Sequence, residues 1–241
     1  MTVGEYYPKL DTWPQVFRAK TTLLEVGQSL GEAYGNAMSG FRFGVLDDVL
    51  APEVQRELNG YSPVDQFAAR FEKYRDLPTL QQLQAVDLET YLPGDILVKV
   101  DRATMAYSLE ARCPLLDRGL GELAGKLPSG FQIHNGVGKH IYKQAVSPYV
   151  PHEIIHRGKW GFGAPRSDWL RTSLKQTFQD VVMQPEMEQY LSPHAVQKIW
   201  EAHQAGSSDY GRELWTLLML GCWHGRHRCS TKGDIFADVA R

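Results

Sequence analysis

Residues 212–224 read RELWTLLMLGCWH, and this stretch decides the class of fold. It is apolar on most sides, a pattern typical of a helix that is buried within a protein. On its N-terminal side, Ser192 and Pro193 suit the N-cap and the first turn of another helix, which Gly206 ends. The C-terminal part of the chain is therefore expected to be helical.

Further helical segments occupy the rest of the chain. Leu80, Leu83 and Leu88 recur at helical spacing after Pro78, which suits a first turn. Shorter helices are expected near residues 14–26, 52–58, 63–75, 94–109, 117–126 and 138–147. We expect no β-hairpin, and FQIH at 131–134 is the only candidate strand. The sequence predicts a mostly α fold.

Composition excludes several classes of protein. The chain has 241 residues, 43% of them hydrophobic, which is enough to bury a core as one large domain or two small ones. Its 26 basic and 28 acidic residues give a formal charge of −2, so nothing drives binding to nucleic acid. Three cysteines are too few for a disulfide framework, and no apolar run reaches the roughly 18–20 residues that span a bilayer. The N-terminus does not resemble a signal peptide. We expect a cytoplasmic protein without a membrane partner.

Residues 152–156 read HEIIH, the spacing of zinc-dependent proteases. On a helix, the two histidines would share one face with the glutamate beside them as general base. The glycine-rich stretch at 158–163 stops such a helix soon after the second histidine. The extended motif also needs a glycine and a histidine where this chain has Lys159 and Phe162. A zinc hydrolase is the least favoured alternative, and we expect no metal site.

GVGK at 136–139 invites comparison with a phosphate-binding Walker loop. That loop requires a glycine three positions before Gly136, and a serine or threonine after its lysine. This chain has Ile133 and His140 there, so the Walker interpretation fails.

Three segments, in this order, resemble the C-terminal part of the synthetase domain of glutamine-hydrolysing asparagine synthetases. They are LPGDILVKVDRATMAYSLEARCPLLD at 92–117, GVGKHIYKQAV at 136–146, and VPHEIIHRGKWGFGAPRSDWLR at 150–171. The resemblance runs from about residue 80 to 225. The opening segment, which includes YPKLDTWPQVFRAKTTL, is similar to exosortase-associated amidotransferases.

This resemblance implies both a reaction and a fold. A glutaminase domain with a catalytic cysteine releases ammonia. The synthetase domain uses ATP and Mg²⁺ to adenylate the aspartate side chain, and ammonia then displaces AMP to give asparagine. That domain is α/β, with an adenine-nucleotide pyrophosphatase (PP-loop) sheet followed by a helical lobe.

The chain departs from the family pattern in what it lacks. It has no N-terminal catalytic cysteine, no Ser-Gly-Gly-x-Asp-Ser loop and no Gly-Asp-Glu motif. We therefore expect residues 1–227 to be the helical C-terminal portion of the synthetase domain, without the nucleotide-binding sheet, and residues 228–241 to be a loosely ordered tail. Alone, this portion is expected to be inactive and to hold no cofactor tightly.

The expected partners follow from the same resemblance. They are the missing glutaminase and PP-loop regions of the same polypeptide, and the small substrates aspartate, glutamine and ATP. Relatives act on other carboxylates, so the identity of the acceptor carboxylate is left open. Whether the protein forms a homo-oligomer is also left open. The competing hypothesis is a binding or structural module that kept the fold and lost catalysis.

Lys159 is the predicted catalytic residue. In a loop flanked by glycines, a lysine can approach a polyphosphate closely, and a fixed cation stabilises charge on a leaving pyrophosphate. The resemblance places the matching lysine of the R-x-K-x-G-F motif at the active site.

Three further cations are predicted to bind the nucleotide. Lys139 begins a helix, where its charge opposes the helix dipole unless a bound phosphate removes the conflict. Lys99 and Arg102 lie three apart on one side of a helix. The resemblance implies that the Lys139 position faces the nucleotide phosphates and that the basic position of Lys99 lies towards the nucleotide. Arg102 matches the K-x-D-R signature of the family.

The neighbours of these cations are interpreted as structural. Asp101, Glu110 and Arg112 are expected to form a salt-bridge network, Cys113 to be a core thiol, and Asp117 to cap the helix that follows it. The tryptophans are expected to pack within the core.

Overall fold

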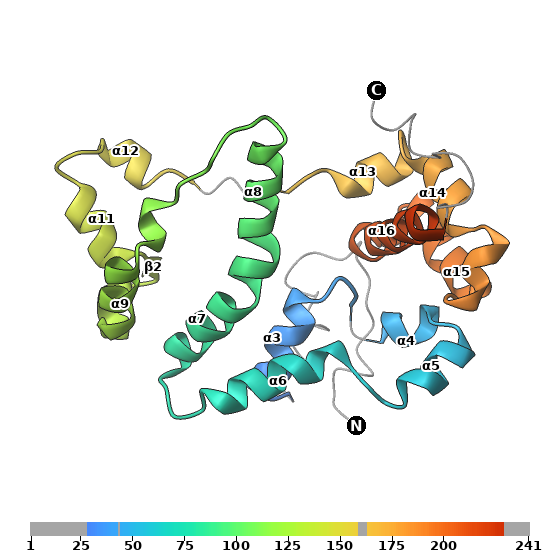
Figure 1. The fold of residues 1–241 in the computed structure, drawn as a ribbon, viewed down its shortest axis with the longest axis horizontal. Coiled ribbons are helices and arrows are strands. Elements are labelled where there is room, and N and C mark those ends of the chain that lie inside the picture. Colours follow the sequence, from blue (N-terminus) through green and yellow to red (C-terminus); the bar gives the residue numbers. More distant parts are fainter. Residues whose placement is uncertain (1–27, 43, 159–162, 229–241) are drawn as a thin grey trace. The chain divides into compact units, whose positions relative to one another are not determined.

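The computed structural model describes residues 28–42, 44–158 and 163–228, which are mostly helical (Figure 1). The N-terminal helices are α3 (Leu30–Met38), α4 (Val45–Val49), α5 (Pro52–Leu58), α6 (Pro63–Lys73) and α7 (Thr79–Glu89). They are followed by the π-helix η2 (Leu92–Leu97), α8 (Val98–Met105), the 3₁₀ turn η3 (Pro114–Leu116), α9 (Arg118–Lys126) and α10 (Ser129–Gln132). After a short hairpin come α11 (His140–Val146), α12 (His152–Ile155), α13 (Arg166–Arg171), α14 (Lys175–Val182), the 3₁₀ turn η4 (Pro185–Gln189), α15 (Pro193–Gln204) and α16 (Gly211–Arg228).

The prediction of a mostly α protein is confirmed. α5 has the predicted bounds, and α15 begins at Pro193 as expected, with Gly206 at a positive φ of 70° just beyond its end. The expected helix at 14–26 lies outside the described residues. Among the described helices, α3, α4, α10, α13 and α14 were not expected. None of the described helices is both long and apolar enough to cross a membrane.

One prediction about strands was wrong, because a β-hairpin is present. Strands β1 (Ile133–His134) and β2 (Val137–Gly138) pair antiparallel, with Ile133 opposite Gly138. Asn135 and Gly136 form the turn with φ of 49° and 75°, the positive values that a two-residue type I′ turn requires. Asn-Gly is the strongest short sequence signal for such a turn, so this hairpin was predictable from residues 135–136 and should have been expected.

The described chain divides into two compact units. Unit 1 comprises residues 1–69 and 163–241, and unit 2 comprises residues 70–162. This division does not test the prediction that residues 1–227 are a single helical portion of a larger domain, which stays a prediction.

Unit 1 contains most of the hydrophobic core. α16 packs on α13 and α14, and the aromatic ring of Phe178 on α14 stacks on that of Trp200 on α15, with centroids 4.4 Å apart and planes 3° from parallel. Leu170 and Leu214, from α13 and α16, are also fully buried. The apolar stretch at 212–224 is therefore part of a core helix, as predicted.

Unit 2 is built differently. α7, η2 and α8 follow one another closely along the chain, as the green segment of Figure 1 shows. Among the described residues of this unit, Phe71 and Val86 are the only buried hydrophobic side chains. The capping predicted for Asp117 is confirmed. Its carboxylate accepts a hydrogen bond from the Leu120 N–H at 3.1 Å and caps α9.

Candidate functional site

Two of the predicted nucleotide-binding cations lie on α8. Lys99 is exposed and forms an i, i+4 ion pair with Asp95 at 3.6 Å. The guanidinium of Arg102, one turn further along, is exposed and forms no ion pair or hydrogen bond within the described part of the chain. Since exposed ion pairs contribute little, the charge of Lys99 remains accessible to an anion. Both side chains therefore present positive charge to solvent from one helix.

Lys139 lies where the hairpin meets α11. It is the N-cap residue of that helix and adopts a left-handed conformation, with φ of 58° and ψ of 35°. Such a conformation is uncommon for a residue with a Cβ and costs energy that other interactions must offset. The side chain is exposed, so the predicted position at a helix start is confirmed, and the role of the charge stays a prediction.

Lys159, the predicted catalytic residue, lies outside the described residues, as do Trp160 and Phe162 of the same motif. The chain that precedes the motif belongs to unit 2 and the chain that follows it belongs to unit 1. The grouping of Lys159 with Lys139, Lys99 and Arg102 is therefore untested.

The residues interpreted as structural gave mixed results. Glu110 and Arg112 form an ion pair at 2.7 Å on the surface, but Asp101 does not join it. Cys113 is exposed, so the prediction of a core thiol is wrong for the chain as it stands. Trp200 is buried as expected, whereas Trp223 is 55% exposed.

The HEIIH segment forms a helix of a single turn. α12 ends at Ile155, and His156 is already its C-cap, in agreement with the glycines that follow. The rings of His152 and His156 lie 4.3 Å apart, and burial, His152 and Lys143 together lower the pKa of His156. Within the described ranges, no group of three His, Cys, Asp or Glu side chains could hold a metal ion. A zinc hydrolase receives no support from this geometry.

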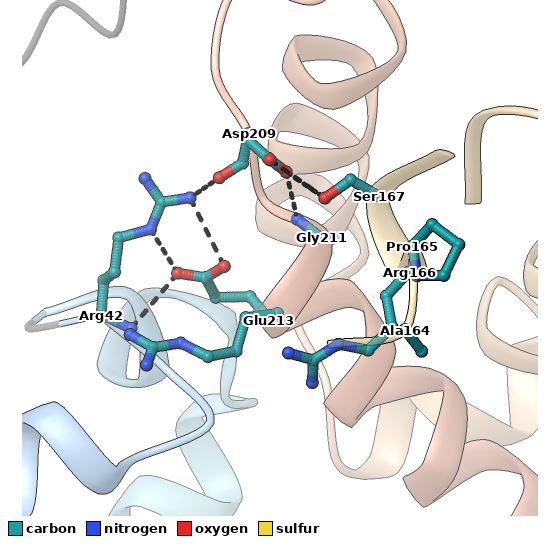
Figure 2. Close-up of a pocket in the computed structure, with 9 residues that line it drawn as sticks. Arg42, Ala164, Pro165, Arg166, Ser167, Asp209, Gly211 and Glu213 are labelled. Carbon is teal, nitrogen blue, oxygen red and sulfur yellow. Dashed lines mark hydrogen bonds and ion pairs between the residues drawn. The ribbon is translucent and has the colours of Figure 1, made fainter. Parts of the chain in front are cut away.

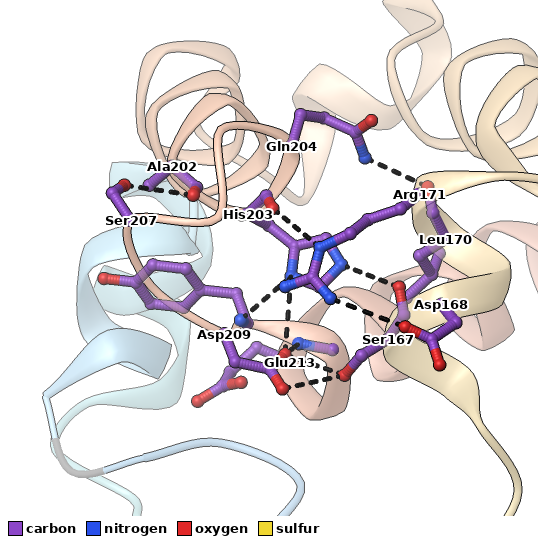
Figure 3. A network of polar contacts seen from close by, with 12 residues as sticks. Ser167, Asp168, Leu170, Arg171, Ala202, His203, Gln204, Ser207, Asp209 and Glu213 are labelled. Carbon is purple, nitrogen blue, oxygen red and sulfur yellow. Dashed lines mark hydrogen bonds and ion pairs between the residues drawn. The ribbon is translucent and has the colours of Figure 1, made fainter. Parts of the chain in front are cut away.

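A polar cluster that was not predicted from the sequence lies in unit 1, around His203 (Figure 3). The His203 side chain is fully buried, and its Nδ1 accepts a hydrogen bond from the Tyr210 N–H at 3.2 Å. Because Nδ1 is the acceptor, the proton must lie on Nε2, which donates to the Ser167 carbonyl at 3.2 Å. The ring is therefore neutral and joins α13, α15 and the start of α16.

Burial and the charge of Arg171 favour that neutral state, and they outweigh the opposing effect of Asp209 and Glu213 on the pKa of His203. Burial lowers the pKa of His203, and the Arg171 guanidinium lowers it further. Arg171 itself donates from Nε to the His203 carbonyl at 3.0 Å. Burial alone would raise the pKa of Asp209, but hydrogen bonds from the Ser167 hydroxyl and the Gly211 N–H outweigh it and lower that pKa.

Serine, histidine and aspartate thus lie together, yet they do not form a catalytic triad. A triad requires the hydroxyl to donate to the histidine, with the carboxylate on the other ring nitrogen. Here the Ser167 hydroxyl donates to Asp209 at 2.7 Å, and the histidine is inaccessible to a substrate. We interpret the cluster as a clamp that holds the start of α13 to α15 and α16.

A pocket of about 340 Å³ lies beside this clamp, at the N-terminal end of α16 (Figure 2). Its charged lining residues are Arg42, Arg166, Arg212, Asp209 and Glu213. The Glu213 carboxylate is buried and pairs with the Arg42 Nε at 2.5 Å, and Arg42 also donates to the Asp209 carbonyl.

Four of the five charged residues that line the pocket already have partners, and this argues against a ligand site. Both carboxylates already have donors, and Arg212 donates to the Ala37 carbonyl at 3.3 Å. An entering anion would also meet the charge of Asp209. We therefore interpret these contacts as a second set of interactions that stabilises unit 1, by joining the α3–α4 connection to α16.

His203 and Glu213 were missed in the sequence analysis, but the sequence around each contains a signal that could have revealed it. His203 follows Val196, Ile199 and Trp200 at helical intervals, which places it on the buried face of α15. Glu213 is the single carboxylate within the largely apolar segment 212–224, and a buried carboxylate requires a partner.

Comparison with known proteins shows which family of proteins the chain is similar to. The family profile described as "Asparagine synthase" matches residues 9–225. A Mycobacterium tuberculosis protein, provisionally named a glutamine-hydrolysing asparagine synthetase, is 36% identical over 88% of this chain and 32% of its own length. Asparagine synthetase (glutamine-hydrolysing) 1 of Bacillus subtilis is 29% identical over 88% of this chain and 33% of its own length.

A relative that is named as an amidase also matches. Amidase chry2 of Gibberella zeae is 28% identical over 44% of this chain and 17% of its own length. No solved structure matches the chain. The chain spans about a third of the length of the synthetases it resembles.

Proposed function

Since the chain belongs to the asparagine synthase family, we propose that it is part of a glutamine-hydrolysing amidotransferase of the asparagine synthase type. Such an enzyme amidates an aspartate carboxylate, using ATP and ammonia from glutamine, through an aspartyl-AMP intermediate. The observation that carries the proposal is the family match over residues 9–225. The cytoplasmic location expected from the sequence belongs to the same proposal.

We propose that this chain is the helical C-terminal portion of a PP-loop synthetase domain. The matched synthetases extend over about three times the length that it spans, so most of each relative lies outside the matched region. By itself the chain is then inactive, and it completes an active site with polypeptide that carries the nucleotide-binding sheet and the glutaminase.

The chain's contribution to the chemistry is positive charge. The side chains of Lys99, Lys139 and Arg102 are exposed, and ammonium and guanidinium groups fit phosphate oxygens. ATP supplies the activation of the carboxylate when it is bound. Lys159 then stabilises the negative charge that develops on the leaving pyrophosphate.

Magnesium requires ligands of another kind. Mg²⁺ binds oxygen atoms, mostly from one or two carboxylates and the substrate phosphates. In the ranges that the structure describes, no cluster of three candidate ligand side chains exists. The resemblance assigns magnesium binding in part to the Gly-Asp-Glu motif, which this chain lacks. We therefore propose phosphate contacts for this chain and Mg²⁺ ligation for other parts of the polypeptide.

The acceptor carboxylate is proposed to be that of aspartate, because both the Mycobacterium tuberculosis and the Bacillus subtilis relatives are named as asparagine synthetases. The competing hypothesis is that another carboxylate is amidated, since the family resemblance leaves the acceptor open. Supplying aspartate and non-aspartate carboxylates in parallel, and measuring AMP release with each, distinguishes the two.

Lys159→Ala in the complete natural polypeptide tests the proposed role of the chain. We expect ATP-dependent amidation to be lost while glutaminase activity is retained, because the cation acts only on the leaving pyrophosphate. A cation in this position contributes on the order of 100-fold or more to the rate. Lys175→Ala, at an exposed lysine of α14, is the matched control and should leave both activities unchanged.

Two outcomes would decide against the proposal. Unchanged amidation in Lys159→Ala would remove this lysine from the mechanism. A complete polypeptide that neither consumes ATP nor binds it would favour a structural module that kept the fold and lost catalysis.

A further inference from the structure

The helix that carries Lys99 and Arg102 does not continue α7 as a regular α-helix. Between α7 and α8 lies the π-helix η2, whose hydrogen bonds join residues five apart instead of four. A π-turn therefore holds one residue more than an α-turn. Such turns are rare and are found frequently at functional sites, so the position of this one directly before two exposed cations requires an explanation.

The residues around η2 account for the interruption of the α-helix. Pro93 has no N–H to donate to the Glu89 carbonyl, and in an α-helix its ring would clash with that carbonyl. Thr90 leaves the helical conformation, with φ of −124° and ψ of −74°, whereas Tyr91 has helical values again. The amino-acid sequence itself therefore favours an irregular turn at this point.

A side chain satisfies the carbonyl that the interruption releases. In a continuous α-helix the Thr90 N–H would donate to the Val86 carbonyl, but it donates to the Asp87 carbonyl, at 3.3 Å. The Thr90 hydroxyl takes its place and donates to the Val86 carbonyl at 2.7 Å. Because Val86 is fully buried, its carbonyl requires such a donor.

The extra residue of η2 affects where the side chains of α8 point. Each residue turns an α-helix by about 100° and lengthens it by about 1.5 Å. Since the wider π-turn takes up the extra residue, α8 keeps the direction it would have if that residue were absent and the helix were regular. In this direction Lys99 and Arg102 lie exposed on one side of α8, and the half-buried Val100 lies on another.

We propose that η2 is a positioning element that directs Lys99 and Arg102 towards the nucleotide phosphates. A change of length that η2 absorbs leaves both cations in place, and a change that it does not absorb turns both away. The role of the cations rests on the proposed function. The geometry of α7, η2 and α8 is measurable without any substrate.

Two deletions in the complete natural polypeptide test this proposal. Deleting Pro93 removes both the helix breaker and the extra residue, so α7 and α8 should join through an α-turn with the cations in place. Deleting Pro93 and Gly94 together removes one residue too many and turns α8 by about 100°. We expect the KM for ATP to stay near the wild-type value after the first deletion and to rise on the order of tenfold or more after the second, because contacts between charged groups are lost.

A rescue variant separates direction from damage to the fold. In the double deletion, Val100 and Ala103 occupy the former positions of Lys99 and Arg102. Val100→Lys with Ala103→Arg in that background should therefore bring the KM for ATP back towards the wild-type value. Gly94→Ala at full length is the control and should leave the KM unchanged, because a Cβ at this position meets nothing within 4 Å.

A distance between two spin labels measures the direction of α8 in the 241-residue chain. Leu88→Cys on α7 and Met105→Cys on α8 place the labels at exposed positions, after the natural cysteines are replaced by serine. The deletion of Pro93 should nearly preserve the distance. The double deletion should shorten it by on the order of 5 Å, because the labels turn from nearly opposite sides of the helix towards the same side.

Three results would overturn the proposal: a KM for ATP that rises equally in both deletions, a rise that the rescue variant does not reverse, or a label distance that is equal in the two deletions. An unchanged KM in the double deletion would also overturn it and leave the proposed function standing. A complete polypeptide that does not use ATP would refute the proposed function, and the label distances would then decide whether η2 sets the direction of α8.

Discussion

Replacing His203 by phenylalanine removes both ring nitrogens from a fully buried position and keeps a ring of comparable size. The Tyr210 N–H and the Ser167 carbonyl would then lose the partners that now lie 3.2 Å away. A buried group without a partner costs about 1–3 kcal/mol, so the two together should lower the free energy of unfolding by about 2–6 kcal/mol. Urea denaturation followed by circular dichroism measures this loss at about pH 7.5, above the ordinary pKa of histidine.

Two conservative variants separate the two contacts. His203→Asn keeps an acceptor near the position of Nδ1, and His203→Gln keeps a donor near the position of Nε2. Each should retain one hydrogen bond and lose about half as much stability as the phenylalanine variant. A loss below about 0.5 kcal/mol for His203→Phe, the range of ordinary surface substitutions, would refute the interpretation of this cluster as a clamp.

The same histidine makes stability depend on pH. Its pKa in the folded protein is lowered, first by burial and then by Arg171, so the unfolded chain binds the proton more readily. The contribution of His203 is therefore fully present above about pH 6.5 and is lost as the pH falls from there towards the lowered folded-state value. Between about pH 7.5 and about pH 5, the wild type should lose more stability than His203→Gln, by at most about 1.4 kcal/mol per pH unit. Parallel pH dependence in the two proteins would contradict the neutral tautomer.

Two further substitutions test other parts of the fold. Arg42→Met should lower the free energy of unfolding by about 3–5 kcal/mol, because it leaves the buried Glu213 carboxylate without its counter-charge, and adding Glu213→Met should restore much of the loss in denaturation measurements. No recovery in the double variant would contradict this pairing. Gly136→Val should destabilise the hairpin by about 1–2 kcal/mol, since a β-branched residue is strained at a φ of 75°, whereas Gly136→Asn should be tolerated better. Amide exchange of the β1–β2 pair measures that difference, and equal protection in both variants would refute it.

The helices could be predicted where the sequence has a proline suited to the first turn or an apolar pattern typical of a buried helix. Pro52 and Pro193 each occupy the first turn of a helix as expected, and the apolar stretch from 212 onward is a core helix. α13 and α14 were missed because they are short, of six and eight residues. α13 in addition depends on contacts with α15 that are far away in the sequence.

The candidate site could be predicted only in part. The expected helices placed Lys139 at a helix start and Lys99 with Arg102 on one helix, and the structure has both arrangements. The exposure of Cys113 could not be predicted from the sequence, because cysteine is often buried and the apolar residues Pro114 and Leu115 that follow it are typical of a core.

Assaying the complete natural polypeptide with ATP, aspartate and glutamine tests most directly whether the chain belongs to an active amidotransferase. We predict that asparagine forms, with one AMP released for each asparagine. ADP as the nucleotide product, or no amide product with aspartate or any other carboxylate supplied, would contradict the proposed function.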